Sequence, residues 1–322
     1  MARPEGGSAG TATAGNSVRF GATDAAMLLT TLIWAVNFSV VKYGIRIFPP
    51  HGFNGVRMTL ASLIYLVVWA LLRDGFSLRK GDLWKAAGLG LLGTTGYQFF
   101  FIQGLRATTA STTSMIAPMT PVFIAMLSHF LGYERVHLAA WVGIAVSFTG
   151  FYLLLTGQAG PLTLNSATVR ANLLILAANL MWALYTVFSR PLLARIPPLR
   201  LAILTTSFGT LFYLPLAAGG IADIRLGRIP APAWGAVFFS GVLAIVVGYA
   251  VYYSSVRKVG NTKTAIYSNL NPVFATIFAV LFLAERVTPL QVGGGLVIFL
   301  GVYLTRSGYR YFKRARDERF EV

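Results

Sequence analysis

Residues 121–136, PVFIAMLSHFLGYERV, return further along the chain at residues 272–287 as PVFATIFAVLFLAERV. Both copies begin with Pro-Val-Phe and end with Glu-Arg-Val, at an offset of 151 residues. The same offset gives 15 identities over residues 104–157, where composition alone would give roughly five. One of these identities is the pair Gly143 and Gly294. The chain therefore contains an internal duplication.

An offset of 148 extends this duplication toward the N-terminus. Leu-Ile-Trp-Ala at 32–35 matches Leu-Met-Trp-Ala at 180–183, and the double proline at 49–50 matches the one at 197–198. Together the two offsets relate most of the first half of the chain to the second half. We interpret the halves as two copies of one structural unit.

The composition places this unit in a lipid bilayer. Of 322 residues, 56% are hydrophobic and 11% are charged, whereas about 25% of an average soluble protein is charged. The absence of cysteine and the scattering of three histidines exclude thiolate chemistry and argue against a metal or other cofactor. A net charge of +17 would indicate nucleic acid in a soluble protein. Here the basic residues lie between apolar stretches, where they orient membrane spans, so no nucleic-acid partner is expected.

Ten apolar stretches have about the 20 residues that a helix needs to cross a bilayer. Their length excludes barrel strands of roughly ten residues. The predicted spans are 24–45, 52–72, 83–105, 111–131, 137–156, 171–193, 199–219, 233–256, 262–284 and 288–308. The sequence therefore predicts an all-α membrane protein with ten transmembrane helices.

Each copy of the duplicated unit contains five of these spans. Because five is odd, the second copy enters the membrane from the opposite face, which predicts two inverted five-helix repeats. The expected organisation is a disordered cytoplasmic tail at 1–23, a first repeat at 24–157, a linker at 158–170, a second repeat at 171–308 and a basic cytoplasmic tail at 309–322.

The distribution of Lys and Arg predicts the orientation. With the N-terminus in the cytoplasm, 19 of the 27 basic residues fall on the cytoplasmic side and seven on the opposite side. An excess of Lys and Arg marks the cytoplasmic loops of membrane proteins. Both termini are therefore expected on the cytoplasmic side of the cell membrane.

The duplicated pattern resembles the drug/metabolite transporter superfamily, and within it the EamA-type exporters with ten spans and two EamA domains. The resemblance covers about 24–308. It rests on Trp34 and Trp182, on the Lys42…Pro49-Pro50…Arg57 run, and on both Pro-Val-Phe…Glu-Arg endings. It implies a transporter in which spans 1–4 and 6–9 surround a cavity, with spans 5 and 10 supporting it from outside.

Two features depart from the family pattern. Thr205 stands where the repeat would place a second copy of Arg57, so a role of that arginine is not duplicated. No carboxylate lies deep within a span, unlike the small multidrug members of the superfamily, whose first-span Glu drives proton exchange. We therefore expect transport without carboxylate-based proton coupling.

Polar and aromatic side chains at matching mid-span positions define a candidate binding site. Trp34 and Asn37 match Trp182 and Tyr185, and each pair lies on one helical face. An amide near the bilayer centre is costly unless it faces a cavity or another helix, so binding and interhelical packing are both open. The predicted substrate-binding residues are Trp34, Asn37, Tyr97, Gln98, Trp182, Tyr185, Tyr249, Tyr267, Asn269 and Asn271.

Prolines within two spans predict helix kinks. Pro118 and Pro121 in span 4 and Pro272 in span 9 each remove a backbone donor. Bent helices at mid-membrane are where transporters bind polar solutes, although a purely structural bend is equally compatible.

Three cations lie closest to the apolar zone, namely Lys42, Arg57 and Lys263. They could attract a carboxylate or phosphate. We favour a structural role, in which both lysines reach out from helix ends and Arg57 binds loop carbonyls. The centre of the site is then expected to be uncharged.

The duplicated Glu134 and Glu285 indicate helix-end caps or ion pairs. The glycines of spans 5 and 10 indicate close packing or a dimer face.

The predicted function is a carrier that moves a small polar or amphipathic metabolite, such as an amino acid, outward by alternating access. No catalytic residue is expected, the partners are a small-molecule substrate and the bilayer, and the protein is a monomer or a homodimer. A channel or a lipid flippase is the alternative. An intramembrane enzyme is disfavoured because its clustered Asp, Glu or His are lacking in this sequence.

Overall fold

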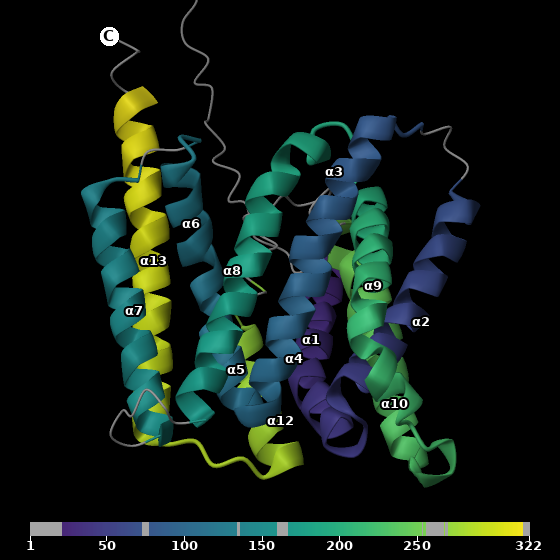
Figure 1. Ribbon diagram of the computed structural model, residues 1–322. Helices are drawn as coiled ribbons and strands as arrows, with labels where there is room; N and C mark the ends of the chain where they lie inside the picture. The colour runs from purple at the N-terminus through teal and green to yellow at the C-terminus, as the bar shows by residue number, and fades with distance from the viewer. Residues whose placement is uncertain are drawn as a thin grey trace, which may run out of the picture.

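A computed structural model of the chain describes residues 21–72, 77–133, 136–159, 167–252, 254–255, 267 and 270–317. Every regular element within these residues is a helix, and Figure 1 shows the long helices side by side in one bundle. Eight helices of the described part are long and apolar enough to cross a membrane. The prediction of an all-α membrane protein is confirmed.

These eight helices comprise continuous helices and composite stacks. They are α1 (Ala22–Ile47), α2 (Pro50–Leu71), the stack of α5 (Ala110–Ile116), η2 (Ala117–Met119) and α6 (Thr120–Phe130), α7 (Leu138–Ala159), α8 (Ala167–Leu193), α9 (Pro198–Ala222), α10 (Ala231–Phe238) with η4 (Phe239–Val247), and α13 (Pro289–Asp317).

Two predicted spans have a different helical form. The first is a stack of α3 (Lys80–Gly90), the π-helical η1 (Leu91–Gly96) and α4 (Tyr97–Ala107), whose beginning carries Lys80, Asp82 and Lys85. The second is α12 (Asn271–Leu283), which is apolar but has 13 residues. A short 3-10 turn, η3 (Leu226–Arg228), lies before α10. Residues 1–20 and 160–166, which include most of the predicted N-terminal tail and linker, lie outside the described residues.

The duplicated prolines begin equivalent helices. Pro50 is the first residue of α2 and Pro198 is the first residue of α9. Proline suits the first turn because its missing N–H would have no intrahelical acceptor there, and its fixed φ already matches the helix. The repeat visible in the sequence therefore corresponds to a repeat in helix boundaries.

The two halves of the chain are interleaved in the bundle. The most extensive helix contacts pair α7 with α13, α2 with α9, α4 with α8 and α1 with α12, and each pair joins the first half to the second. Figure 1 shows α7 beside α13 at one edge of the bundle and α2 beside α9 toward the other. Each half consequently completes its packing only in the presence of the other.

The glycines of α7 and α13 are used for packing within the molecule. A Cβ added to Gly150 would lie 2.7 Å from the carbonyl oxygen of Gly294 and 2.5 Å from the Ile298 nitrogen. A Cβ on Gly143 would likewise meet Gly301 and Thr305. Small residues at such positions let two helix backbones approach closely in a membrane. Of the two interpretations of these glycines, the structure supports packing of α7 on α13.

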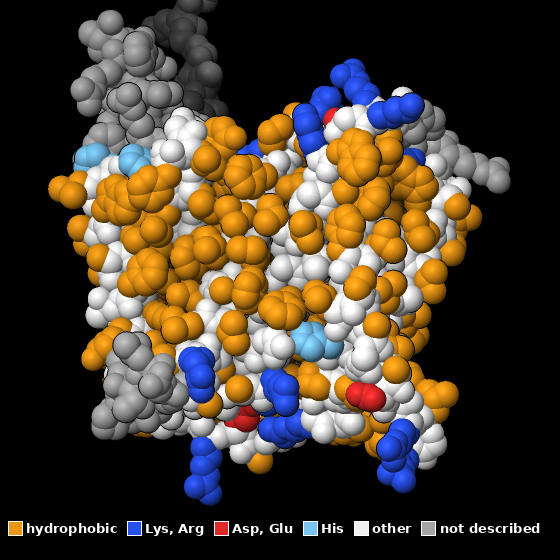
Figure 2. All heavy atoms as spheres, in the orientation of Figure 1, with side chains coloured by type: hydrophobic (Ala, Val, Ile, Leu, Met, Phe, Trp, Pro, Cys, Tyr) orange, Lys and Arg blue, Asp and Glu red, His pale blue; other side chains and the backbone are white. Residues whose placement is uncertain are grey.

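The outer surface is suited to lipid. Leu63, Leu66, Val67 and Leu71 on α2 are each more than half exposed. Figure 2 shows hydrophobic side chains covering the middle of the face in view, with Lys and Arg gathered toward its two ends. An exposed apolar belt of this extent is the surface of a protein that contacts a bilayer.

Candidate functional site

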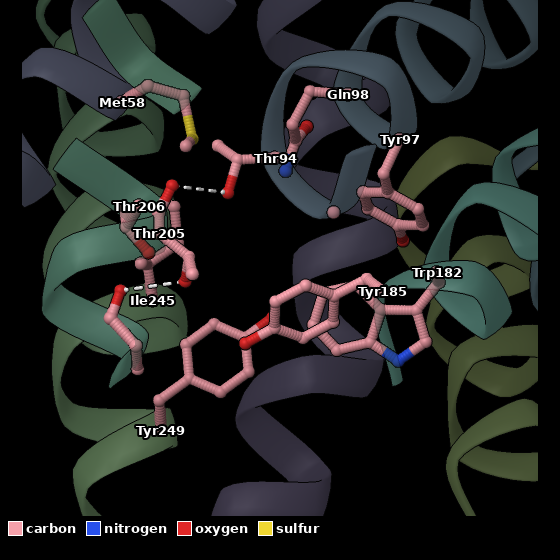
Figure 3. A pocket seen from close by; sticks show the side chains of 12 residues that line it. Met58, Thr94, Tyr97, Gln98, Trp182, Tyr185, Thr205, Thr206, Ile245 and Tyr249 are labelled. Atoms are coloured by element: carbon pink, nitrogen blue, oxygen red, sulfur yellow. Dashed lines mark hydrogen bonds between the residues drawn. The ribbon is translucent and has the colours of Figure 1, made fainter. Parts of the chain in front are cut away.

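A cavity of about 40 Å³ lies inside the bundle and is lined by both halves of the chain. Its volume accommodates a few water molecules. The lining residues come from α2, η1, α4, α8, α9 and the helix around η4 (Figure 3), and they are Met58, Gly93, Thr94, Tyr97, Gln98, Trp182, Tyr185, Ala202, Thr205, Thr206, Ile245 and Tyr249.

Aromatic rings form one side of this cavity. In Figure 3, Trp182, Tyr185 and Tyr249 lie along the lower edge of the space, across from Thr94 and Gln98. The ring centroid of Trp182 is 5.0 Å from that of Tyr185 and 6.3 Å from that of Tyr249. These spacings fall in the range of favourable aromatic pairs.

Tyr249 also connects the two tryptophans that the repeat matches. Its ring centroid lies 5.7 Å from that of Trp34 and 6.3 Å from that of Trp182. Trp34 does not line the cavity itself but is one aromatic contact away from it. The structure therefore brings the matched positions of spans 1 and 6 to one aromatic cluster.

Two π-helical segments stand at equivalent places of the two halves. At an offset of 151, η1 (Leu91–Gly96) falls on the last six residues of η4 (Phe239–Val247). A π turn redirects backbone carbonyls away from the regular helical pattern. In η4 these carbonyls are used, because Trp34 Nε1 donates to Ala244 O at 2.8 Å and Tyr65 Oη donates to Ile245 O at 3.0 Å.

The segment η1 is hydrogen-bonded to α9 through two threonine side chains. Thr94 Oγ1 donates to Thr205 O at 3.2 Å, and Thr95 Oγ1 donates to Gly209 O at 2.7 Å. The backbones approach closely here, since a Cβ on Gly209 would lie 2.6 Å from the Gly90 carbonyl oxygen. Hydrogen bonds from side chains to backbone carbonyls thus hold each π segment against helices of the other half of the chain: η4 against α1 and α2, and η1 against α9.

Arg57 lies directly behind the cavity wall and is 2% exposed. Its Nε donates to Asn54 Oδ1 at 2.8 Å, its Nη1 to Ser240 Oγ at 2.6 Å and its Nη2 to Gln98 Oε1 at 2.8 Å. The expectation that Arg57 binds loop carbonyls is therefore wrong. The reason is tertiary: α4 and η4 bring neutral side-chain acceptors to the guanidinium, which lies inside the bundle and not at a helix end.

The environment of Arg57 leaves its charge unbalanced. Among the described residues, Arg195 forms an ion pair with Asp82 at 2.7 Å. No described carboxylate pairs with Arg57. The two amide oxygens and the serine hydroxyl that accept from the guanidinium carry no charge. The residues that line the cavity are uncharged, and the guanidinium of Arg57 lies next to its polar edge.

A second polar network lies beside Arg57 at the beginning of α2. His51 Nδ1 is 2.6 Å from Tyr213 Oη, and His51 Nε2 is 2.9 Å from Gln103 Nε2. Because the Gln103 amide nitrogen donates, His51 Nε2 accepts and Nδ1 carries the proton toward Tyr213. The histidine ring also stacks on Phe99 at 5.6 Å. Nothing in the repeat pattern singled out His51, because its matched position is Leu199.

Several predicted site residues lie away from the cavity. Asn37 and Asn271, on the packed helices α1 and α12, each have a buried Oδ1 for which the described residues supply no hydrogen-bond partner. Tyr267 Oη donates to Asp24 Oδ1 at 2.8 Å, near the beginning of α1. Asn269 lies outside the described residues. The cavity is thus lined by Tyr97, Gln98, Trp182, Tyr185 and Tyr249 among the ten predicted residues.

The predicted kinks have different outcomes in the structure. Pro118 lies in the 3-10 turn η2, which interrupts span 4, and Pro121 follows in the first turn of α6. The carbonyl of Ile116, just before this interruption, accepts from Asn179 Nδ2 at 2.9 Å. Pro272 lies in the first turn of α12, and residues 268–269 before it lie outside the described residues, so a kink at Pro272 stays a prediction.

The remaining charged candidates are at helix ends. Lys42 Nζ donates to the carbonyl oxygens of Leu105 at 2.6 Å and Thr108 at 2.5 Å, where α4 ends. Glu285 Oε1 accepts from the backbone N–H of Ala110 at 2.8 Å, where α5 begins. Lys263 and Glu134 lie outside the described residues. No group of three or more possible metal ligands occurs in the described part of the chain.

Sequence reasoning missed about half of the cavity wall. Its small and aliphatic members, Met58, Gly93, Ala202 and Ile245, carry no chemical signal of their own. Thr205 stands out in the sequence only as the residue at the place of a second arginine. The π segments that turn Thr94 and Ile245 toward the cavity are not visible in a uniformly apolar sequence.

Comparison with known proteins identifies a matching family and several similar proteins. The sequence profile of the EamA-like transporter family matches residues 22–156 and 169–307. An uncharacterized transporter of Archaeoglobus fulgidus is 29% identical over 284 residues, covering 87% of this chain and 96% of that protein. A crystal structure at 20% identity covers 89% of this chain and 97% of its own with a TM-score of 0.61, a likeness that concerns the fold.

Two further relatives have names that mention a substrate. A probable terminal-alkyne amino-acid exporter of Streptantibioticus cattleyicolor is 28% identical over 283 residues, covering 87% of this chain and 91% of that protein. A probable amino-acid metabolite efflux pump of Escherichia coli is 26% identical over 297 residues, covering 90% and 96% of the two chains.

Proposed function

Because the chain belongs to the EamA-like transporter family, we propose that it exports a small polar or amphipathic metabolite, such as an amino acid, across the cytoplasmic membrane. The central cavity carries this proposal, since both halves of the chain line it and aromatic rings face polar groups across it. Cavities with mostly apolar walls and a few placed polar groups are typical of small-molecule sites.

The proposal includes ten spans in two inverted repeats. In support, α3, η1 and α4 follow each other without a break as elements of 11, 6 and 11 residues, enough to cross a bilayer in a straight line. The equivalent prolines of α2 and α9 and the equivalent π segments also fit a duplicated unit. The inverted relation places matched residues at similar depth around one site.

The small cavity fits one state of an alternating-access cycle. A volume of about 40 Å³ is filled by a few water molecules, which is less room than most amino acids need. A substrate can therefore enter only after some wall helices separate, and it is enclosed again before release on the other side. Amino acids as cargo are supported by the names of the two relatives, which concern those proteins.

A flux assay tests this function. The purified full chain is placed in sealed liposomes, and uptake of amino acids, amines and neutral amphipathic metabolites is measured with and without the same compound inside. We expect saturable uptake of at least one compound, accelerated by counterflow. Conductance without saturation would indicate a channel, and movement of labelled phospholipid would indicate a flippase.

The orientation is tested separately by reporter fusions. With both termini in the cytoplasm, a green fluorescent protein fused to the C-terminus should fluoresce, and alkaline phosphatase fused at the same place should be inactive because it is not exported. An active phosphatase fusion would contradict an even number of spans with a cytoplasmic N-terminus.

A further inference from the structure

We propose that Arg57 and Gln98 form a carboxylate-recognition subsite at the polar edge of the central cavity, so the transported substrate carries one carboxylate group. This inference rests on the proposed transport function and adds the chemical class of the cargo. Four observations carry it: the depth of Arg57, its missing counter-charge, the orientation of Gln98, and the asymmetry between the two halves.

The depth of Arg57 makes its charge costly. It is the eighth residue of α2, about 10 Å along the helix from Pro50, and it is 2% exposed. Its guanidinium is hydrogen-bonded inside the bundle and does not extend to the outer surface of the protein. Charged residues inside membrane proteins are rare and mark substrate or ion pathways.

The neighbours of Arg57 solvate the guanidinium but do not neutralise it. Asn54, Gln98 and Ser240 take three of its five N–H donors, and no described carboxylate pairs with it. A structural arginine in an apolar interior is normally paired with an acid, because the unpaired charge has a large desolvation cost. The missing anion is therefore the group that this site is built to receive.

Gln98 connects the guanidinium of Arg57 to the cavity. Its Oε1 accepts from Arg57 Nη2 at 2.8 Å, so its Nε2–H donors point elsewhere, and Figure 3 shows the Gln98 amide extending toward the interior of the cavity beside Thr94. A donor whose carbonyl oxygen is bonded to a cation is polarised and becomes a stronger donor. A carboxylate in the cavity can accept from Gln98 while it lies in the field of Arg57.

The asymmetry of the repeat limits recognition to one acid group. Thr205, at the place matching Arg57, lines the cavity without charge, and its hydroxyl donates to the backbone carbonyl of Leu201 at 2.9 Å. The aromatic edge formed by Trp182, Tyr185 and Tyr249 is suited to an apolar group or to the face-on contact of an ammonium group. The cavity therefore orients a cargo with its carboxylate toward Arg57.

Matched acid and amide probes test the subsite directly. Binding of L-phenylalanine, L-phenylalaninamide, 3-phenylpropionate and 3-phenylpropanamide to the purified full chain is measured by calorimetry. For at least one pair we expect the acid to bind tenfold or more tightly than its amide, as for a charge-assisted hydrogen bond. Equal affinities, or no binding of either acid, would overturn the proposal.

Variants identify the residues responsible. Arg57→Gln and Gln98→Leu should bring the acid-to-amide ratio close to one, and Arg57→Lys should keep part of the preference. Gln98→Glu supplies an internal partner for Arg57, so it should remain folded and still lose acid binding. Acid preference that persists in both Arg57→Gln and Gln98→Glu would overturn the assignment.

A control variant separates this role from the general loss of a buried arginine. Arg200 is 3% exposed on α9, but its guanidinium lies over the Trp69 ring and donates to Leu72 O at 3.1 Å, away from the cavity. Arg200→Gln should therefore keep the acid preference.

The flux assay separates failure of the subsite from failure of the proposed function. If liposomes show flux of an amine or a neutral compound without any acid preference, the carboxylate subsite is wrong and the transport function stands. If no compound in the flux screen moves, the proposed function itself fails.

Discussion

Lys42 and Glu285 hold opposite ends of the same loop, although they come from different halves of the chain. Lys42 binds the carbonyl oxygens at the end of α4, and Glu285 binds the N–H groups of Ala110 and Ser111 at the beginning of α5. The cation thus meets the negative end of one helix and the anion meets the positive end of the next. This loop is fixed to both repeats by complementary charges.

Glu285→Gln should lower the free energy of unfolding by about 1 to 3 kcal/mol, because a charged acceptor of two buried backbone N–H groups is replaced by a neutral amide. Thermal unfolding of the purified protein in detergent measures the loss. The neighbouring Arg286 is exposed, so Arg286→Gln should change stability by no more than about 0.5 kcal/mol. Equal effects of the two substitutions would show that the cap contributes nothing.

Trp34→Phe should destabilise the π segment by about 0.5 to 1.5 kcal/mol, because the hydrogen bond to Ala244 O is lost while most aromatic contacts remain. Its repeat partner Trp182 provides the comparison, since Trp182→Phe alters the cavity lining. We expect Trp34→Phe to act mainly on the melting temperature and Trp182→Phe mainly on substrate affinity. The reverse pattern would contradict these roles.

Gly150→Ala should separate α7 from α13 and cost about 1 to 3 kcal/mol, since the two atoms nearest to the added methyl group are backbone atoms of Ile298 and Gly294, which cannot rotate away. Gly293→Ala is the matched control on α13, because its Cβ would have nothing within 4 Å. Thermal unfolding should therefore distinguish the two variants. Similar melting temperatures would show that the two helices can move apart freely.

Cysteine labelling tests the position of the cavity, because the natural chain has no cysteine. A cysteine replacing Thr206, which lines the cavity, should react with a small water-soluble thiol reagent and be protected by substrate. The same replacement at Ser128, which is fully buried on α6 away from the cavity, should remain unreactive. Labelling at 128 but not at 206 would place the water-accessible path elsewhere.

The duplicated segments and apolar stretches were sufficient to predict an all-helical membrane bundle. They also marked Trp34 and Trp182 as matched site residues, of which Trp182 lines the cavity and Trp34 does not. Periodicity could not distinguish π from α helix, so the bonds of Trp34 and Tyr65 to η4 were not foreseeable. The interpretation of Arg57 failed because its acceptors, Gln98 and Ser240, come from distant helices. Local sequence shows a cation within an apolar span but not which side chains tertiary packing brings to it.

The interleaving of the two halves also has a consequence for biogenesis. Ser240 is made 183 residues after Arg57, and Glu285 is made 175 residues after the N–H group of Ala110 that it binds. At roughly 5 to 20 residues per second, the ribosome takes on the order of 10 to 40 s to supply these partners. The helices of the first half are therefore made before these partners exist, with Arg57 only partly bonded. Final assembly of the core is a post-insertion event that begins when the last helices emerge.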